Sequence, residues 1–177
     1  MGLMNGRMKE PLVDCLIEEA AWQGIDLAGL SERVARIVLT DQELDPDAWE
    51  ISLIGCDDAR IADLNAEFRG KPTPTNVLSW PAQDLAAEDD GEEPYFPEPF
   101  VPGERDSLGD IAISYQTCLR EAEAAGKSVH DHVTHLVIHG VLHLLGYDHI
   151  RDADAQLMES IEVRILAALG IANPYEI

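Results

Sequence analysis

Apolar positions follow two spacings along the chain, and together they predict a fold that combines strands with helices. Alternating or β-branched runs predict four strands, over residues 11–19, 49–55, 76–80 and 108–116. Apolar positions three and four apart predict five helices, over residues 27–39, 57–70, 116–125, 128–145 and 152–169. This order is typical of an α+β fold, in which a small mixed sheet of about four strands packs with about five helices.

One segment, residues 82–106, interrupts this order and differs from the rest of the chain in composition. It carries nine acids, one arginine and four prolines, a mixture that cannot build a core. We therefore expect a single domain over residues 1–177, with this acidic, proline-rich insertion as a mobile, solvated loop whose removal leaves the fold intact. Its aromatic residues Tyr95, Phe96 and Phe100 are the groups that could tie it to the domain.

The chain is strongly acidic, with 34 Asp and Glu residues against 12 Lys and Arg residues and a net charge of -22. Such a charge repels phosphates, which argues against a general nucleic-acid coat but leaves room for a local basic pocket. Three cysteines without a CxxC pair indicate reduced thiols in a cytoplasmic protein. Acids interrupt the first apolar stretch, so neither a signal peptide nor a membrane span is expected there.

The predicted helix over residues 129–145 is apolar on nearly its whole circumference, which is typical of a buried helix, so we expect it at the centre of the domain. His139 and His143, four residues apart, lie on one face of it. Two imidazoles inside a core need polar partners, because an unpaired buried polar group costs roughly 1–3 kcal/mol. A divalent metal ion provides such a partner for both rings at once.

A third histidine follows the helix after a glycine. Gly146 lets the chain leave the helix and turn back, so that His149 can approach the pair. Three protein ligands and one open position are typical of a catalytic zinc site rather than a closed structural one. His135, one turn earlier on the same face, is the rival third ligand. His130 and His132 stand near the helix start, where we expect them to be solvated or to cap the helix.

The residue after the first histidine of the pair is Gly140. Metalloproteases with an HExxH motif carry there the glutamate that acts as general base, so a peptidase is disfavoured. A glycine at this position either lets backbone or substrate approach the metal closely, or allows close helix–helix packing. The sequence leaves both explanations open.

The stretch HGVLHLLGYDH, residues 139–149, resembles the signature of the YbeY family of metal-dependent endoribonucleases, which mature bacterial ribosomal RNA. The stretches LNAEFRGKPTPTNVLSWP (64–81) and LGDIAIS (108–114), and the order of the elements between them, are also similar to that family. The likeness extends from about Leu27 to Tyr175, and the segment 82–106 is longer than the connection typical of the family.

The resemblance implies one Zn²⁺ per chain, bound by His139, His143 and His149, and a catalytic role for Arg69. It implies a zinc-dependent endoribonuclease that prefers single strands and acts in 16S rRNA 3′-end maturation and 70S ribosome quality control. The implied partners are small-subunit ribosomal RNA, the ribosome and its assembly proteins, in the cytoplasm, with no membrane and no DNA. The alternatives are a ribosome-assembly factor with a structural zinc and another metal-dependent hydrolase, such as a peptidase.

The chemistry of Arg69 agrees with this role. Its guanidinium presents a planar set of donors that matches a phosphate, and Lys71 adds a second positive charge two residues later. The two side chains could hold an RNA backbone locally on an otherwise acidic protein. The alternative is a charge that complements the dipole at the end of the helix over residues 57–70.

Overall fold

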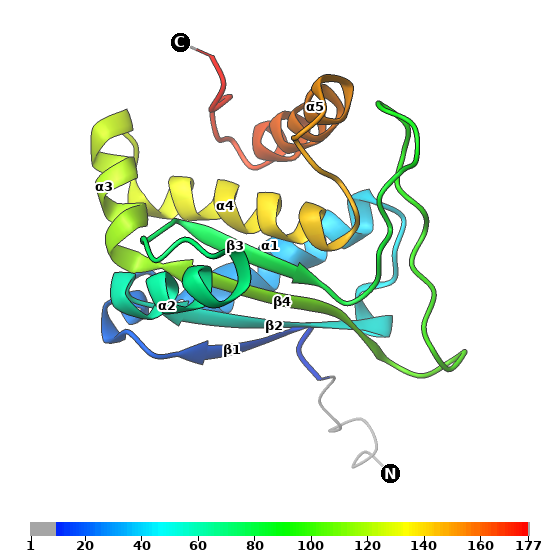
Figure 1. Ribbon diagram of the computed structural model, residues 1–177, viewed down its shortest axis with the longest axis horizontal. Coiled ribbons are helices and arrows are strands. Elements are labelled where there is room, and N and C mark those ends of the chain that lie inside the picture. Colours follow the sequence, from blue (N-terminus) through cyan, green and yellow to red (C-terminus); the bar gives the residue numbers. More distant parts are fainter. Residues whose placement is uncertain (1–9, 177) are drawn as a thin grey trace.

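Four strands form one mixed sheet in the order β1-β2-β4-β3 in the computed structural model, which describes residues 10–176 (Figure 1). The strands are β1 (Val13–Ile17), β2 (Trp49–Cys56), β3 (Val77–Pro81) and β4 (Asp106–Ser114). β1, β2 and β4 are parallel, and β3 pairs antiparallel with β4 at the edge of the sheet. Side chains of β2 alternate as its sequence predicts, since Trp49, Ile51 and Leu53 are buried while the residues between them are exposed.

Five α-helices accompany the sheet, and this number and order confirm the α+β prediction. They are α1 (Leu27–Asp41), α2 (Asp58–Arg69), α3 (Tyr115–Ala125), α4 (Val129–Leu144) and α5 (Asp152–Ala168). Two short 3-10 helices, η2 (Ala20–Ile25) and η3 (Pro46–Ala48), were not expected from the sequence. α1 and α4 cover one face of the sheet, α5 lies outside α4, and α2 packs on the opposite face (Figure 1). The histidine-bearing helix α4 is therefore central, as predicted.

The ends of α2 show how the sequence fixes an element that borders the functional site. The Asp57 carboxylate accepts a hydrogen bond from the Arg60 backbone N–H at 2.8 Å, which caps the first turn. Gly70 ends the helix in the left-handed conformation, with φ 71°. Arg69 is therefore held on the last turn of a helix whose two ends are both defined.

The amino-terminal prediction is tested only in part. Residues 1–9, which begin the stretch expected to hold no signal peptide, lie outside the described residues. From residue 10 to residue 176, no helix has both the length and the apolar character needed to cross a membrane.

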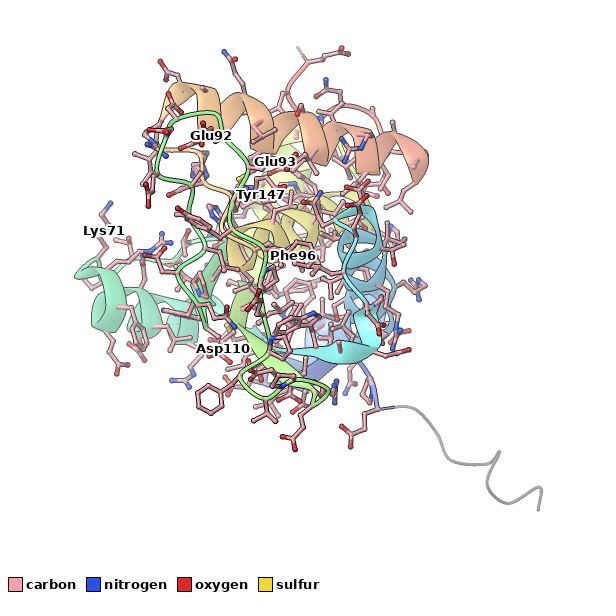
Figure 2. All side chains as sticks on the ribbon, turned by 90° about the vertical axis from the view of Figure 1, so that its right-hand side faces the viewer. Lys71, Glu92, Glu93, Phe96, Asp110 and Tyr147 are labelled. Atoms are coloured by element: carbon pink, nitrogen blue, oxygen red, sulfur yellow. The ribbon has the colours of Figure 1, made fainter. Side chains whose placement is uncertain are left out.

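The acidic segment between β3 and β4 is more closely bound to the domain than its composition suggests. Tyr95, Phe96 and Phe100 are exposed, so the aromatic rings do not anchor it. Leu85, however, is buried against the turn that follows α4, since a Cβ atom on Gly146 would lie 2.8 Å from Leu85 Cβ. Figure 2, which faces this side, shows Glu92 and Phe96 on the segment as it descends from α5 past α4 towards the sheet. The expectation of a loop solvated throughout is therefore wrong, while its mobility stays a prediction.

The same segment caps α5 from outside the helix. The residue that precedes α5, Arg151, offers no capping side chain. The carboxylate of Asp90 takes over this role, because it accepts hydrogen bonds from Ala153 N–H at 3.4 Å and Asp154 N–H at 2.8 Å. In return, Gly91 N–H donates to the Asp154 carboxylate at 2.8 Å. The segment thus supplies the partners that the first turn of α5 lacks.

Replacing Asp90 by alanine is expected to lower the free energy of unfolding by about 1 kcal/mol, the usual contribution of a helix cap. Urea denaturation of the variant measures the change. Glu104→Ala removes an exposed acid from the same segment and is expected to leave the stability unchanged. Equal stability of the two variants would show that the segment does not support α5.

Candidate metal centre

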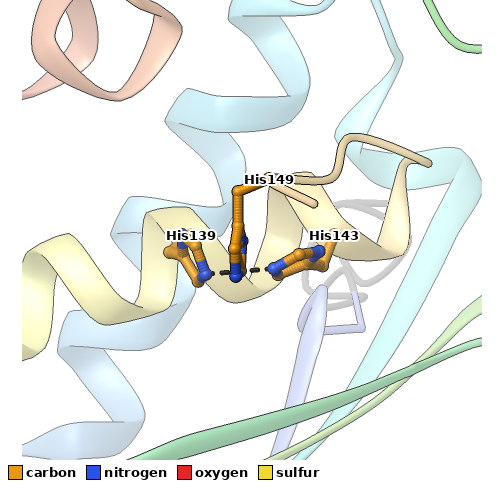
Figure 3. Close-up of side chains that lie close together, drawn as sticks. All are labelled: His139, His143 and His149. Atoms are coloured by element: carbon orange, nitrogen blue, oxygen red, sulfur yellow. Dashed lines mark hydrogen bonds between the residues drawn. The ribbon is translucent and has the colours of Figure 1, made fainter. Parts of the chain in front are cut away.

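Three histidines meet where α4 ends and the chain turns back (Figure 3). His139 and His143 project from adjacent turns of α4, and His149 returns to them from the following turn. One ligand nitrogen from each ring lies within 4.8 Å of the others, and the Nε2 atoms of His139 and His143 are 3.0 Å apart. Gly146 makes the return possible, since its φ of 101° lies in a region that favours glycine.

Hydrogen bonds fix the orientation of two of these rings. His139 Nδ1 lies 2.7 Å from Oε2 of Glu162 on α5, and His143 Nδ1 lies 2.9 Å from the backbone oxygen of Tyr147. A carboxylate and a carbonyl oxygen both accept, so each imidazole donates through Nδ1–H. Both Nε2 atoms are then left with a lone pair, and these lone pairs face one another.

This arrangement fits a metal ion. Two lone pairs 3.0 Å apart repel unless a cation lies between them, and tetrahedral Zn²⁺ at its usual Zn–N length separates two nitrogens by about 3.3 Å. Burial, with His139 and His149 close by, lowers the pKa of His143 to about 4, so its imidazole is neutral at pH 7 and available as a ligand. The donor set of three imidazoles suits zinc among the divalent ions.

The other three histidines lie outside this group, and the side chains of His132 and His135 are largely buried. His135, the rival ligand, binds Glu162 Oε1 through Nε2 at 2.6 Å. His130 is exposed, as predicted. The prediction for His132 is wrong, because its side chain is only 12% exposed and its Nε2 lies 2.8 Å from the Glu121 carboxylate of α3. The helix that carries Glu121, α3, packs against α4.

The sequence did not reveal Glu162, which is fully buried on α5. Burial alone would raise the pKa of its carboxyl group, but hydrogen bonds from His135, His139 and Tyr175 outweigh burial and hold the pKa at about 2. The sequence did contain a sign of its role, because Glu162 is a charged residue among the apolar positions of α5 that pack on α4, next to Ile161. A charged residue in such a stripe requires a polar partner.

A cleft of about 1140 Å³ opens beside the three histidines and connects them with the end of α2. Arg69 lines this cleft together with Thr75 and Asn76, which precede the edge strand β3. Within residues 10–176, Arg69 is the one lysine or arginine among the lining residues, and it forms no hydrogen bond or ion pair there. Its guanidinium donors are therefore available to a ligand in the cleft.

Gly140 serves the packing of α4 on the sheet. A Cβ atom at this position would lie 3.2 Å from Ile111 Cδ1 and 3.3 Å from Ser79 Oγ. The Ser79 hydroxyl also donates to the Gly140 carbonyl oxygen at 3.2 Å. A larger side chain here would press on β3 and β4. The glycine therefore allows close helix–sheet packing, and the helix–helix packing considered from the sequence is wrong.

The fold and the three histidines define an α+β protein with a candidate metal site in the wall of a cleft. A family model described as Endoribonuclease YbeY matches residues 16–170, which is most of the chain. The chain therefore belongs to the endoribonuclease YbeY family.

Individual relatives agree with this assignment. The chain is 60% identical to an Endoribonuclease YbeY of Ruegeria pomeroyi over 163 residues, covering 92% of this chain and 97% of the relative. It is 47% identical to an Endoribonuclease YbeY of Rhizobium etli, covering 96% of this chain and 95% of the relative. The solution structure of TM1509 from Thermotoga maritima has the same fold, with a TM-score of 0.52, 19% identity, and coverage of 93% of this chain and 99% of that one.

Proposed function

We propose that this protein is a zinc-dependent endoribonuclease that prefers single strands and acts in 16S rRNA 3′-end maturation and 70S ribosome quality control in the bacterial cytoplasm. Its partners are then small-subunit ribosomal RNA, the ribosome and its assembly proteins. Membership of the endoribonuclease YbeY family supports cleavage of RNA. The observation that carries the proposal is the cleft that three converging imidazoles share with Arg69.

In this proposal His139, His143 and His149 hold the zinc ion, each through one ring nitrogen. A bound zinc ion supplies Lewis acidity toward a phosphoryl oxygen and toward an attacking water. Arg69 binds the same phosphodiester through its planar donors and neutralises the charge that develops on the phosphate. We expect about 7–10 Å between zinc and the guanidinium, since a phosphate with contacts of roughly 3 Å on each side must fit between them.

The cleft also supports the choice between the alternatives. A structural zinc is enclosed by four protein ligands, whereas these three imidazoles line an open cleft. A peptidase of the HExxH type needs a glutamate where Gly140 packs against the sheet. Both observations favour a catalytic site that acts on something other than a peptide bond.

Metal analysis of the purified protein, with a crystal structure of the zinc-bound form, tests the site. We expect one zinc per chain, Zn–N distances of about 2.0–2.1 Å to the three histidines, and a water or other ligand in the fourth position. Zinc bound by His135 in place of His149 would contradict this ligand set. RNA and peptide substrates assayed in parallel test the activity: cut peptide with intact RNA would support the peptidase.

A further inference from the structure

Glu162 is a fully buried carboxylate between α5 and α4, at the wall of the cleft, where a charge is costly unless every acceptor is satisfied. It accepts from His135 Nε2 at 2.6 Å and from Tyr175 Oη at 2.5 Å through Oε1, and from His139 Nδ1 at 2.7 Å through Oε2. One residue of α5 therefore joins two histidines of α4 to the chain that follows α5. A purely structural core would have been served by an apolar side chain at this position.

The contact with His139 controls what this ring offers to a metal. A neutral imidazole carries one proton, and the nitrogen without it is the one that can bind a cation. Because the carboxylate accepts from Nδ1, the proton stays on Nδ1 and the lone pair of Nε2 points at His143 Nε2, 3.0 Å away. The second carboxylate oxygen cannot rotate away, since His135 and Tyr175 hold it.

Tyr175 completes this arrangement from the end of the chain. After α5 the chain returns to α4, and Tyr175 lines the same cleft as the three histidines. Its ring packs edge-on against His135, with centroids 5.6 Å apart and planes at 89°. Its hydroxyl donates to Glu162 Oε1, so the tyrosine restrains the carboxylate that restrains His139.

We propose that Glu162 and Tyr175 are positioning residues of the metal site: Glu162 keeps His139 in the tautomer and orientation that bind zinc, and Tyr175 keeps the Glu162 carboxylate in place. The inference rests on the proposed metal-dependent function, but it concerns zinc binding and not the cleavage step. Partners of this kind, placed behind a metal ligand, typically contribute 10–100-fold in metal affinity.

Two substitutions separate the two roles. Glu162→Gln keeps the shape of the side chain but replaces one acceptor oxygen by an NH₂ donor. The imidazole of His135 or of His139 must then accept a hydrogen bond from this NH₂ group, and its proton must move to its other ring nitrogen. We expect zinc affinity to fall by about 10–100-fold. Tyr175→Phe keeps the ring and removes the hydroxyl, so we expect a smaller loss. The matched control is Glu121→Gln, which alters another carboxylate–histidine contact of α4, at His132, that reaches no member of the triad.

The experiment combines zinc affinity, measured by competition with a chelator on full-length protein, with ¹⁵N NMR of the histidine side chains in the metal-free state. The expected result is the Nδ1–H tautomer of His139 in the wild-type protein and wild-type affinity in Glu121→Gln. Wild-type zinc affinity in a folded Glu162→Gln variant would overturn the proposal. If that variant does not fold, the wild-type spectrum decides, because an Nε2–H tautomer of His139 is incompatible with the proposed role. Zinc binding without RNA cleavage would contradict the proposed function and leave this inference standing.

Discussion

Replacing His143 by alanine is expected to remove both zinc and RNA cleavage. His143 is the middle member of the triad, with Nε2 3.0 Å from that of His139, and its ring is held by the Tyr147 carbonyl oxygen. Without it, two imidazoles and water remain, too few protein ligands for a stable zinc site. The cleavage rate should fall by on the order of 10³-fold or more, the factor that corresponds to the several kcal/mol a metal supplies.

Metal analysis and a single-turnover assay on the same preparation measure both losses. His132→Ala is the matched control, because it removes another partly buried imidazole of α4 that binds Glu121 instead of the triad. This control should retain one zinc per chain and nearly the wild-type rate, even if it is less stable. Loss of zinc in both variants would point to general damage of α4 instead of loss of a ligand.

Replacing Arg69 by glutamate is expected to abolish cleavage while zinc content and fold persist. Arg69 is the cationic side chain that lines the cleft, and a carboxylate in its place repels the phosphate that should bind there. We expect the rate to fall by on the order of 10²–10³-fold, the usual cost of removing one stabilising donor from a developing charge. Single-turnover cleavage of a structured ribosomal RNA fragment measures the change.

Replacing Arg69 by lysine tests whether the planar geometry of the guanidinium matters for phosphate binding. Arg69→Lys keeps the charge but replaces a planar set of donors by a compact ammonium group, so we expect an intermediate rate. The matched control is Arg33→Glu, which makes the same charge change as Arg69→Glu at an exposed position of α1 that does not line the cleft. We expect this control to cleave RNA at the wild-type rate. If Arg69→Glu cleaves at the wild-type rate, the proposal that zinc and Arg69 act together on one phosphodiester is wrong.

The strands and helices could be predicted because each is encoded locally. Alternation in β2, the stripe of α1 and the glycines after α2, α3 and α4 each follow from residues a few positions apart. The triad was predictable for the same reason, since eleven residues hold all three ligands and the turn between them. The 3-10 helices were missed because three to six residues carry too little periodicity.

Contacts between distant segments could not be predicted in this way. Glu162 lies 23 residues from His139, and Tyr175 lies 40 residues from His135. No spacing rule connects such pairs, because α4, α5 and the chain end meet only through packing. The role of Asp90 was hidden for the same reason, since its hydrogen-bond partners lie more than 60 residues away at the start of α5. Composition alone therefore made its segment look solvated throughout.

The most direct test of zinc-dependent cleavage is a titration of zinc into metal-stripped protein. Bound zinc and the single-turnover cleavage rate of an RNA fragment from the 3′ end of 16S rRNA are measured on the same samples. We predict that the rate rises in proportion to bound zinc and levels off at one zinc per chain. A cleavage rate that stays constant as zinc is added, whether zero or finite, would contradict a metal-dependent endoribonuclease built on His139, His143 and His149.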